Sequence, residues 1–447
     1  MTARRAFPLV WAVTCGAIYT AISLVQFGRM QAASYDNAIF EQAIAGYAHG
    51  GWPISPIKGV GFNLLGDHFS PAIALIAPFY RLFPHSETLL VAQAVLVAVS
   101  VFVIASVAVR TLGWRIGAVV AVAYGLSFGI QSAVAADFHE VALGVPLLAC
   151  AGAAFVESRY DAVVWWSLPL LLVKEDLGLT VAAIGVALLL VRQWRRGLLL
   201  TIGGAVGTAL VLLVIVPLAR SDHSGYAYGL GGDGGFGSLG DDLGRKALTL
   251  LLTLAVGGLV AVVSPWAVVA IPTLAWRFAA ANAHYWGTGW HYSLVLMPVM
   301  AIAGIDVMRR VRWARPVGVV ALVAVTCLAL VPTAVIPDPP LTRYLSPSAW
   351  HRTERQQAAD RVIALIPPGA TVDSDIGLID HLIGRGRRVT WTGTRDVAGT
   401  PDWVVMDHDP TSGIGSPPSA KEYARKRYGG SYRTVLSVWP FEVARRD

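Results

Sequence analysis

The chain has little charge and very little cysteine. Asp, Glu, Lys and Arg make up 14% of its 447 residues, whereas soluble globular domains carry about 25%. The three cysteines, Cys15, Cys150 and Cys327, all lie in apolar stretches, so they predict small buried residues rather than a disulfide framework. Residues 337–447 contain no Gly-x-Gly-x-x-Gly or Walker-type loop, so nucleotide chemistry there is unsupported.

Hydrophobic sequence takes the place of charge. Apolar residues make up 55% of the chain, and apolar stretches of about 17–24 residues recur between residues 7 and 336, each long enough to cross a bilayer as a helix. The first stretch, residues 7–27, is longer than the apolar core of a signal peptide, and no Ala-x-Ala site follows it. The sequence therefore predicts a multi-pass membrane protein with a retained first helix.

Arginine is concentrated in short loops between the apolar stretches: Arg4-Arg5, Arg110 with Arg115, 192–196 and 309–315. By the positive-inside rule these loops and the N-terminus face the cytoplasm. The net charge of +7 thus reports membrane orientation and predicts no nucleic-acid partner. Threading the chain on this basis gives about eleven spans: 7–27, 87–109, 116–134, 141–156, two short helices within 162–191, 198–219, 247–263, 265–279, 291–308 and 316–336.

The loop 28–86 is long and faces outward in this threading. It contains a predicted helix at 37–47 and an apolar segment at 71–82 that is too short to span and is expected at the interface. Making 71–82 a full span would invert all later loops and break the charge rule.

The tail, residues 337–447, alternates helix and strand signals. Helices are expected at 348–366, 377–383 and 419–428, and strands at 370–375, 388–392, 403–407 and 433–439. The fold class is therefore a mainly α, polytopic helical bundle (1–336) with a small C-terminal α/β extracytoplasmic domain (337–447).

Nearly every ionisable cluster outside the tail falls on the outer face. The clusters are Tyr35-Asp36-Asn37, Asp67-His68, Asp137 to Glu140, Lys174-Glu175-Asp176 and the loop from His284 to His291. Because ionisable groups are costly near hydrocarbon, their gathering at one depth predicts a membrane-embedded active site.

Each cluster also has a structural interpretation. Asp36 suits a general base or a metal ligand, but Asp is also a common helix N-cap. Asp67 beside His68 can orient an imidazole or bind a metal, or Asp67 and Ser70 simply begin the helix that contains Pro71. The corner with Asp137, His139 and Glu140 suits Mg²⁺ or Mn²⁺, or is a solvated capping corner.

Lys174, Glu175 and Asp176 interrupt an apolar run. Lys174 can neutralise a phosphate while either acid pairs with it or holds a metal, and a structural ion pair is the alternative. In the segment 284–292, Trp and Tyr are typical of the aromatic belt, although sugar rings also stack on aromatic faces. The belt does not explain its two histidines.

Several motifs together resemble a known family. They are Tyr35-Asp36-Asn37-Ala38-Ile39-Phe40-Glu41-Gln42, Gly66-Asp67-His68-Phe69-Ser70-Pro71, Ala77-Pro78-Phe79-Tyr80, Phe138-His139-Glu140, Val173-Lys174-Glu175-Asp176, His291-Tyr292 with Pro298, and the tail from Ile366-Pro367-Pro368-Gly369-Ala370 to Trp403-Val404-Val405-Met406-Asp407. The chain resembles the uncharacterised bacterial membrane family DUF2079, which looks like a member of the GT-C glycosyltransferase superfamily.

The resemblance implies a sugar donor linked to polyprenyl phosphate and used on the non-cytoplasmic face. It implies that Asp36, the acid of the first outer loop, is the base or a metal-site residue. Many GT-C enzymes have a paired acidic motif there, whereas Asn37 follows in this chain. We place substrate and donor binding at Asp67, His68, His139, Lys174, Glu175, His291 and Tyr292, and a possible site for Mg²⁺ or Mn²⁺ at Asp36, Asp137, His139 and Glu140.

The predicted function is a membrane glycosyltransferase that acts on a glycan or other cell-envelope acceptor. Glycosyl transfer with inversion needs a base for the acceptor hydroxyl and a cation for the leaving phosphate. A flippase for lipid-linked sugars is one alternative, but transporters usually place charges near the midplane and show repeated halves. A non-catalytic assembly protein of the cell envelope is the other.

Overall fold

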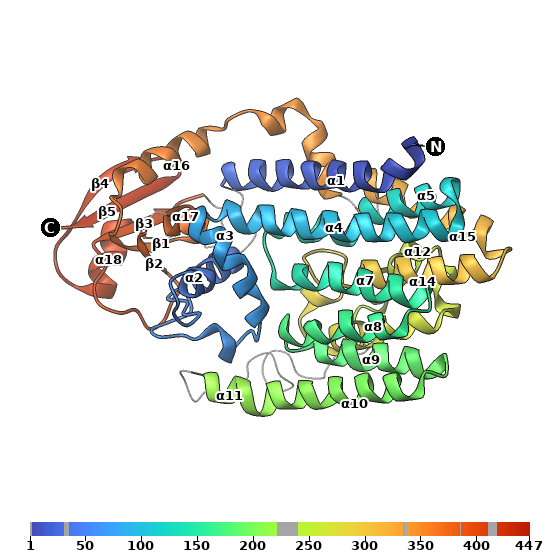
Figure 1. Cartoon of the computed structure of the whole chain (residues 1–447). Coiled ribbons are helices and arrows are strands. Elements are labelled where there is room, and N and C mark those ends of the chain that lie inside the picture. The colour runs from blue at the N-terminus through green and yellow to red at the C-terminus, as the bar shows by residue number, and fades with distance from the viewer. Residues whose placement is uncertain are drawn as a thin grey trace.

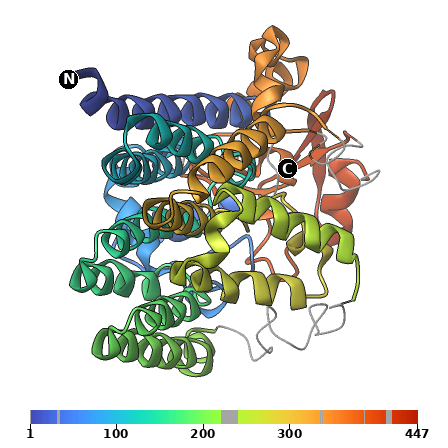
Figure 2. The same ribbon diagram turned by 90° about the vertical axis from the view of Figure 1, so that its right-hand side faces the viewer.

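The computed structural model describes residues 2–30, 35–220, 240–333, 336, 338–384, 386–409 and 418–447. Helices form most of the molecule, and a small sheet lies at one end of them (Figure 1). In Figure 2 the yellow and orange helices of residues 243–330 occupy the middle of the view, beside the blue and green N-terminal helices. The mainly α bundle with a small C-terminal α/β unit is as the sequence predicts.

Four apolar helices in the described part of the chain are long enough to cross a membrane. They are Arg4–Gly28, Glu87–Leu112, Trp114–Ala135 and Trp194–Ala219. The first two are α1 (Thr2–Gly28) and α4 (Glu87–Leu112), which pack side by side in Figure 1. The exact number of spans stays a prediction, because the other apolar helices are shorter.

The other helices of the bundle include the parts into which the last two long helices divide, α5 (Trp114–Gly125) with α6 (Phe128–Ala135) and α10 (Trp194–Leu210) with α11 (Val216–Ala219), and several shorter helices. The shorter helices are α7 (Gly144–Val156), α8 (Tyr160–Ser167), α9 (Leu177–Leu190), α12 (Leu243–Val256), α13 (Ile271–Ala279), α14 (Leu296–Arg310) and α15 (Ala314–Leu330). The predicted break at residues 174–176 is confirmed, since a 3-10 segment ends at Leu172 and α9 begins at Leu177. Glycine lets α9 and α10 approach closely: a Cβ on Gly204 would lie 2.5 Å from Gly178 O.

The outer loop holds α2 (Asp36–Ala48) and a non-spanning apolar segment. That segment, Pro71–Leu82, is a 3-10 turn followed by α3 (Ala77–Leu82). Leu75 and Phe79 are more than 60% exposed on it, so its apolar face is turned away from the protein, as an interfacial segment requires.

A five-stranded sheet forms the core of the C-terminal domain. Its order is β2–β1–β3–β5–β4, with β1 parallel to β2 and β3, and β5 antiparallel to β3 and β4. The strands are β1 (Thr371–Ser374), β2 (Arg388–Trp391), β3 (Trp403–Asp407), β4 (Tyr432–Val438) and β5 (Phe441–Arg446), and the helices are α16 (Glu354–Leu365), α17 (Ile376–Ile383) and α18 (Ala420–Tyr428).

Two details of the C-terminal prediction are wrong. Strand β5 was not anticipated, and the first helix begins at Glu354 rather than at 348. The later start has a local cause, because Thr353 and Gln356 form a capping box that satisfies the first free N–H groups of the helix. Ahead of it, Pro347–Trp350 is a separate 3-10 turn.

Helix α17 joins the sheet domain to the bundle. The Ser86 hydroxyl, just ahead of α4, donates to the carbonyl of Asp380 over 2.9 Å. His381 stacks on Phe27 of α1, with ring centroids 3.8 Å apart. The C-terminal domain is therefore packed against the C-terminal end of α1 and the N-terminal end of α4 (Figure 1).

Candidate active site

Asp36 and His139 form the centre of the outer-face cluster. Nε2 of His139 lies 3.3 Å from Oδ2 of Asp36, and the His139 side chain is 3% exposed whereas that of Asp36 is 35% exposed. Asp36 is the first residue of α2 and the N-cap is Tyr35, so the prediction that Asp36 is the N-cap is wrong by one residue. The carboxylate is instead turned toward an imidazole and remains accessible.

Two further contacts fix the orientation of His139. Its ring stacks on that of His291 with centroids 3.6 Å apart, and His291 is also buried. Gln93 of α4 accepts from His139 N over 3.0 Å and donates to Asp137 O over 2.8 Å. Sequence reasoning missed Gln93, although a single polar residue within an apolar span was the available signal.

Lys174 brings a positive charge to the same cluster. Its Nζ lies 2.7 Å from Oε1 of Glu140, which is 1% exposed. Burial alone would lower the pKa of Lys174, but the carboxylates of Glu140, Glu175 and Asp176 raise it well above its usual value. Lys174 is therefore a charged ammonium group held at the outer corner of the bundle.

The Asp67-His68 pair lies near the same lysine, whose charge acts on the His68 imidazole. Lys58 Nζ is 3.1 Å and His68 Nε2 is 3.6 Å from Asp67 Oδ2. Burial lowers the pKa of His68 despite the opposing effect of Asp67. Glu175 joins this loop to the corner of Lys174, because its Oε2 accepts from Phe69 N over 3.1 Å.

Each alternative for this loop is met in part. Pro71 occupies the first turn of the following 3-10 helix, as predicted, with Ser70 as its N-cap. Asp67 instead follows the preceding 3-10 turn, Leu64–Gly66, and its carboxylate pairs with Lys58 and His68. The prediction that Asp67 and Ser70 start the helix with Pro71 is therefore confirmed for Ser70 and wrong for Asp67.

An aromatic wall closes the cluster. Tyr285 and Tyr292 meet edge to face with centroids 4.7 Å apart. Burial raises the pKa of Tyr292, and the charges of Lys174 and Asp36 also act on its hydroxyl, so both groups lie near it. The ring centroids of His284 and Trp290 lie 6.0 Å apart. His284 is not among the groups that the described contacts place around Asp36.

Arg277 of α13 holds this aromatic loop in place. It is fully buried and donates to the carbonyls of Tyr285 and Gly287 and to the Ser293 hydroxyl, over 2.8, 2.6 and 3.1 Å. Sequence reasoning did not single it out. An arginine inside an apolar stretch on the outer side of the bundle was a usable signal.

The four proposed metal ligands do not form one ligand set. Asp36 faces His139, Glu140 pairs with Lys174, and Asp137 Oδ1 accepts from Gln26 Nε2 over 3.0 Å. In the described ranges, no three His, Cys, Asp or Glu side chains gather as a metal site would require. Metal dependence stays a prediction.

Two buried acids, Glu41 and Asp380, lie where α17 meets the bundle. Glu41 is fully buried and accepts from the hydroxyls of Tyr80, over 2.8 Å, and Ser86. Burial raises the pKa of Glu41 to about 8. Burial also raises the pKa of Asp380 well above its usual value, and the charges of Asp137 and Glu41 add to the effect.

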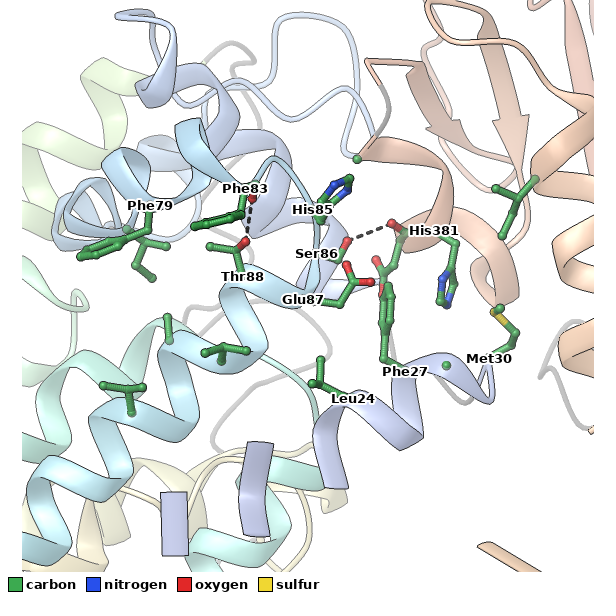
Figure 3. A pocket seen from close by; sticks show the side chains of 18 of the residues that line it. Leu24, Phe27, Met30, Phe79, Phe83, His85, Ser86, Glu87, Thr88 and His381 are labelled. Atoms are coloured by element: carbon green, nitrogen blue, oxygen red, sulfur yellow. Dashed lines mark hydrogen bonds between the residues drawn. The ribbon is translucent and has the colours of Figure 1, made fainter. Parts of the chain in front are cut away.

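A large cavity opens beside these acids, between α1, α3, α4 and the helices α16 and α17 (Figure 3). Its volume is about 1350 Å³. Leu24 and Phe27 of α1 and Phe79 and Phe83 near α3 face one another across it in Figure 3. The lining also includes Leu143 of the 3-10 turn that contains Glu140, so the cavity borders the Lys174 corner.

Comparison with known proteins agrees with this architecture. The chain is similar to ArnT from Cupriavidus metallidurans, both bound to undecaprenyl phosphate (TM-score 0.54, 12% identity, covering 98% of each chain) and in the apo state (TM-score 0.55, 13% identity, covering 99% of this chain and 98% of that one). ArnT is a GT-C glycosyltransferase, and at this identity the likeness shows the fold. No curated protein matches. The family model of the predicted membrane proteins DUF2079 matches residues 26–438, and the chain belongs to this family.

Proposed function

We propose that the protein is a membrane glycosyltransferase that moves a sugar from a polyprenyl-phosphate donor to a cell-envelope acceptor at the extracytoplasmic face. The observation that carries the proposal is the pairing of an accessible carboxylate, Asp36, with buried His139 beside a charged lysine, Lys174. The GT-C fold supports it, as does the undecaprenyl phosphate bound to ArnT in one of the similar structures.

In this proposal Asp36 is the general base. With His139 Nε2–H donating to Asp36 Oδ2, the imidazole orients the carboxylate and keeps it ionised, while its other oxygen accepts the proton of the acceptor hydroxyl. The acceptor oxygen forms a bond to the anomeric carbon as the bond from that carbon to the phosphate oxygen breaks. The phosphate leaves with the electron pair and the configuration inverts.

Lys174 stabilises the leaving phosphate. Charge develops on the phosphate oxygens in the transition state, and a cation already held in place opposes it without reorganisation. Glu140 holds the ammonium group at 2.7 Å, and Tyr285 and Tyr292 offer hydroxyl donors and an aromatic face beside it. The residues of the donor site in this proposal are thus Lys174, His291 and the two tyrosines, with Asp67, His68 and Glu175 supporting them.

The test compares Asp36→Asn with the wild type in membranes of the native host. The measured quantity is the turnover of polyprenyl-phosphate sugars, followed by mass spectrometry of extracted lipids. We expect Asp36→Asn to lose about 10²- to 10⁴-fold in turnover while purified protein still binds undecaprenyl phosphate. The matched control, Asp161→Asn, changes a 78% exposed carboxylate paired with Arg196 and should behave as wild type.

Two outcomes would contradict the proposal. If Asp36→Asn turns over the donor at the wild-type rate, Asp36 is not the base. That result would favour the alternative functions, a flippase or a non-catalytic assembly protein. If the variant loses undecaprenyl phosphate binding as well, Asp36 acts in binding rather than in proton transfer.

A further inference from the structure

We propose that the cavity between α1, α3, α4 and α16–α17 holds the hydrocarbon part of the acceptor, which is therefore a membrane lipid with an uncharged, hydroxyl-bearing head. This inference rests on the proposed function and names its second substrate class. The cavity is not needed for the phosphate of the donor, because Lys174 and the two tyrosines lie outside its lining.

The size and the walls of the cavity suit a lipid chain. Its volume of about 1350 Å³ exceeds the roughly 300–1,000 Å³ of a small-molecule site. Leu24, Val91 and Val95 are among the apolar residues that line it. The exposed face of Pro71–Leu82 extends this apolar surface toward the bilayer, where an interfacial segment would lie.

The charged groups of the lining oppose a phosphate. The carboxylates of Glu87 and Asp360 line the cavity, and Arg352 is the one Lys or Arg among its described lining residues. Arg352 is already paired with Asp360. A phosphate monoester would thus meet like charges without a free partner, which costs free energy in a low-dielectric site. A neutral head meets no such penalty.

The inner end of the cavity offers hydrogen-bonding groups close to the base. Asp380 lies beside the Asn37 amide, and its ionisation is influenced by the charge of Asp36. Burial raises the pKa of Asp380, and its carboxyl oxygens can accept a hydrogen bond from a hydroxyl. A hydroxyl-bearing head at this end lies next to the helix that carries Asp36, with its chains directed toward the membrane.

The experiment uses two photoreactive probes with the full chain in phosphatidylcholine nanodiscs. One is a diacylglycerol carrying a diazirine and an alkyne in its acyl chain, and the other is a farnesyl phosphate carrying the same groups. Cross-linked peptides are mapped by mass spectrometry. We expect the diacylglycerol probe to label residues 88–96 of α4, and the farnesyl phosphate probe to label residues 276–292. Preferential labelling of 88–96 by farnesyl phosphate would overturn the assignment.

Substitutions make the test specific. Val91→Trp fills part of the cavity and should reduce diacylglycerol labelling of α4 at least 10-fold, with farnesyl phosphate labelling of 276–292 unchanged. The control Val320→Trp alters a 69% exposed residue of α15, which is not in the cavity lining, and should change neither. Glu87→Lys should increase farnesyl phosphate labelling inside the cavity several-fold, because it supplies a cation at the rim.

Labelling and turnover separate this inference from the function on which it rests. Equal diacylglycerol labelling of wild type and Val91→Trp would refute the lipid site even if Asp36→Asn abolishes transfer. Labelling as expected together with full turnover by Asp36→Asn would refute the proposed function and the acceptor role, leaving a lipid-binding cavity.

Discussion

Replacing Lys174 by Met should destabilise the protein strongly, because it isolates a buried carboxylate. Glu140 is 1% exposed, and its Oε1 lies 2.7 Å from Lys174 Nζ. Methionine keeps most of the volume of the side chain but removes the ammonium group. Breaking a buried ion pair by removing one partner costs about 3–5 kcal/mol, so the free energy of unfolding should fall by about that amount.

The companion variants separate the ion pair from the role of the lysine toward phosphate. Glu140→Gln leaves Lys174 with Glu175 and Asp176 nearby, so it should cost only about 1–2 kcal/mol. The double variant with Lys174→Met and Glu140→Gln removes both charges and should recover most of the lost stability. Binding of undecaprenyl phosphate should persist in Glu140→Gln and be lost in both variants that lack the lysine.

Stability is measured by reversible unfolding in mixed micelles of a mild detergent and dodecyl sulfate, followed by tryptophan fluorescence. The control Arg110→Met breaks the ion pair between Arg110 and Glu157, and the Arg110 side chain is 57% exposed. Because such an exposed pair contributes little, this substitution should change the free energy of unfolding by less than about 1 kcal/mol. If the double variant is no more stable than Lys174→Met, the two residues do not act as a pair. If Lys174→Met binds undecaprenyl phosphate normally, the phosphate role is wrong.

Three further predictions concern stability. Burial raises the pKa of Glu41 from 4.5 to about 8, so its contribution to stability is complete below pH 4.5 and is lost as the pH rises through about 8. Between pH 5 and pH 9, the midpoint of thermal unfolding of Glu41→Gln should therefore change less with pH than that of the wild type. If the midpoints of both proteins change equally with pH, this prediction is refuted. Thr353→Ala removes the capping box of α16 and should lower the free energy of unfolding by about 1 kcal/mol, measured by the same unfolding in mixed micelles. An unchanged free energy of unfolding would contradict this prediction. Gly204→Ala should lower the midpoint of thermal unfolding. The control Gly203→Ala should not, because a Cβ at that position meets nothing within 4 Å. Equal midpoints for the two variants would contradict the close packing of α9 on α10.

The sequence predicted the outer-face cluster because its constraints act locally. The Arg-rich loops predict the orientation of the chain, and three charges at residues 174–176 are costly within hydrocarbon. Helix length then places the corners of Lys174 and His139 at the same depth. Depth does not fix lateral position, however. The 3.3 Å contact of Asp36 with His139 and the stacking of His139 on His291 depend on how the helices pack, which a periodic pattern of apolar residues leaves open.

The buried acids could not be identified in this way. Glu41 is one of several polar residues in an amphipathic stretch. Asp380 is one of many acidic residues in the C-terminal domain, whose polar composition is typical of a water-exposed domain. Both become buried only because α17 packs against α2 and the start of α4, where Ser86 contacts both residues. Burial that arises between segments from opposite ends of the chain has no local sequence signal.

The same packing changes how the C-terminal domain relates to the catalytic step. Trp391 at the end of β2 stacks on Tyr35, the residue before Asp36, with centroids 4.9 Å apart. Gln42 Nε2 of α2 donates to Val389 O of β2 over 2.8 Å. Because a displacement of about 1 Å at a reacting group can cost 10²-fold in rate, the domain that holds both ends of this segment also positions the base of the proposed reaction. The position of Asp36 is thus set by the sheet domain as well as by the bundle that carries His139 and Lys174.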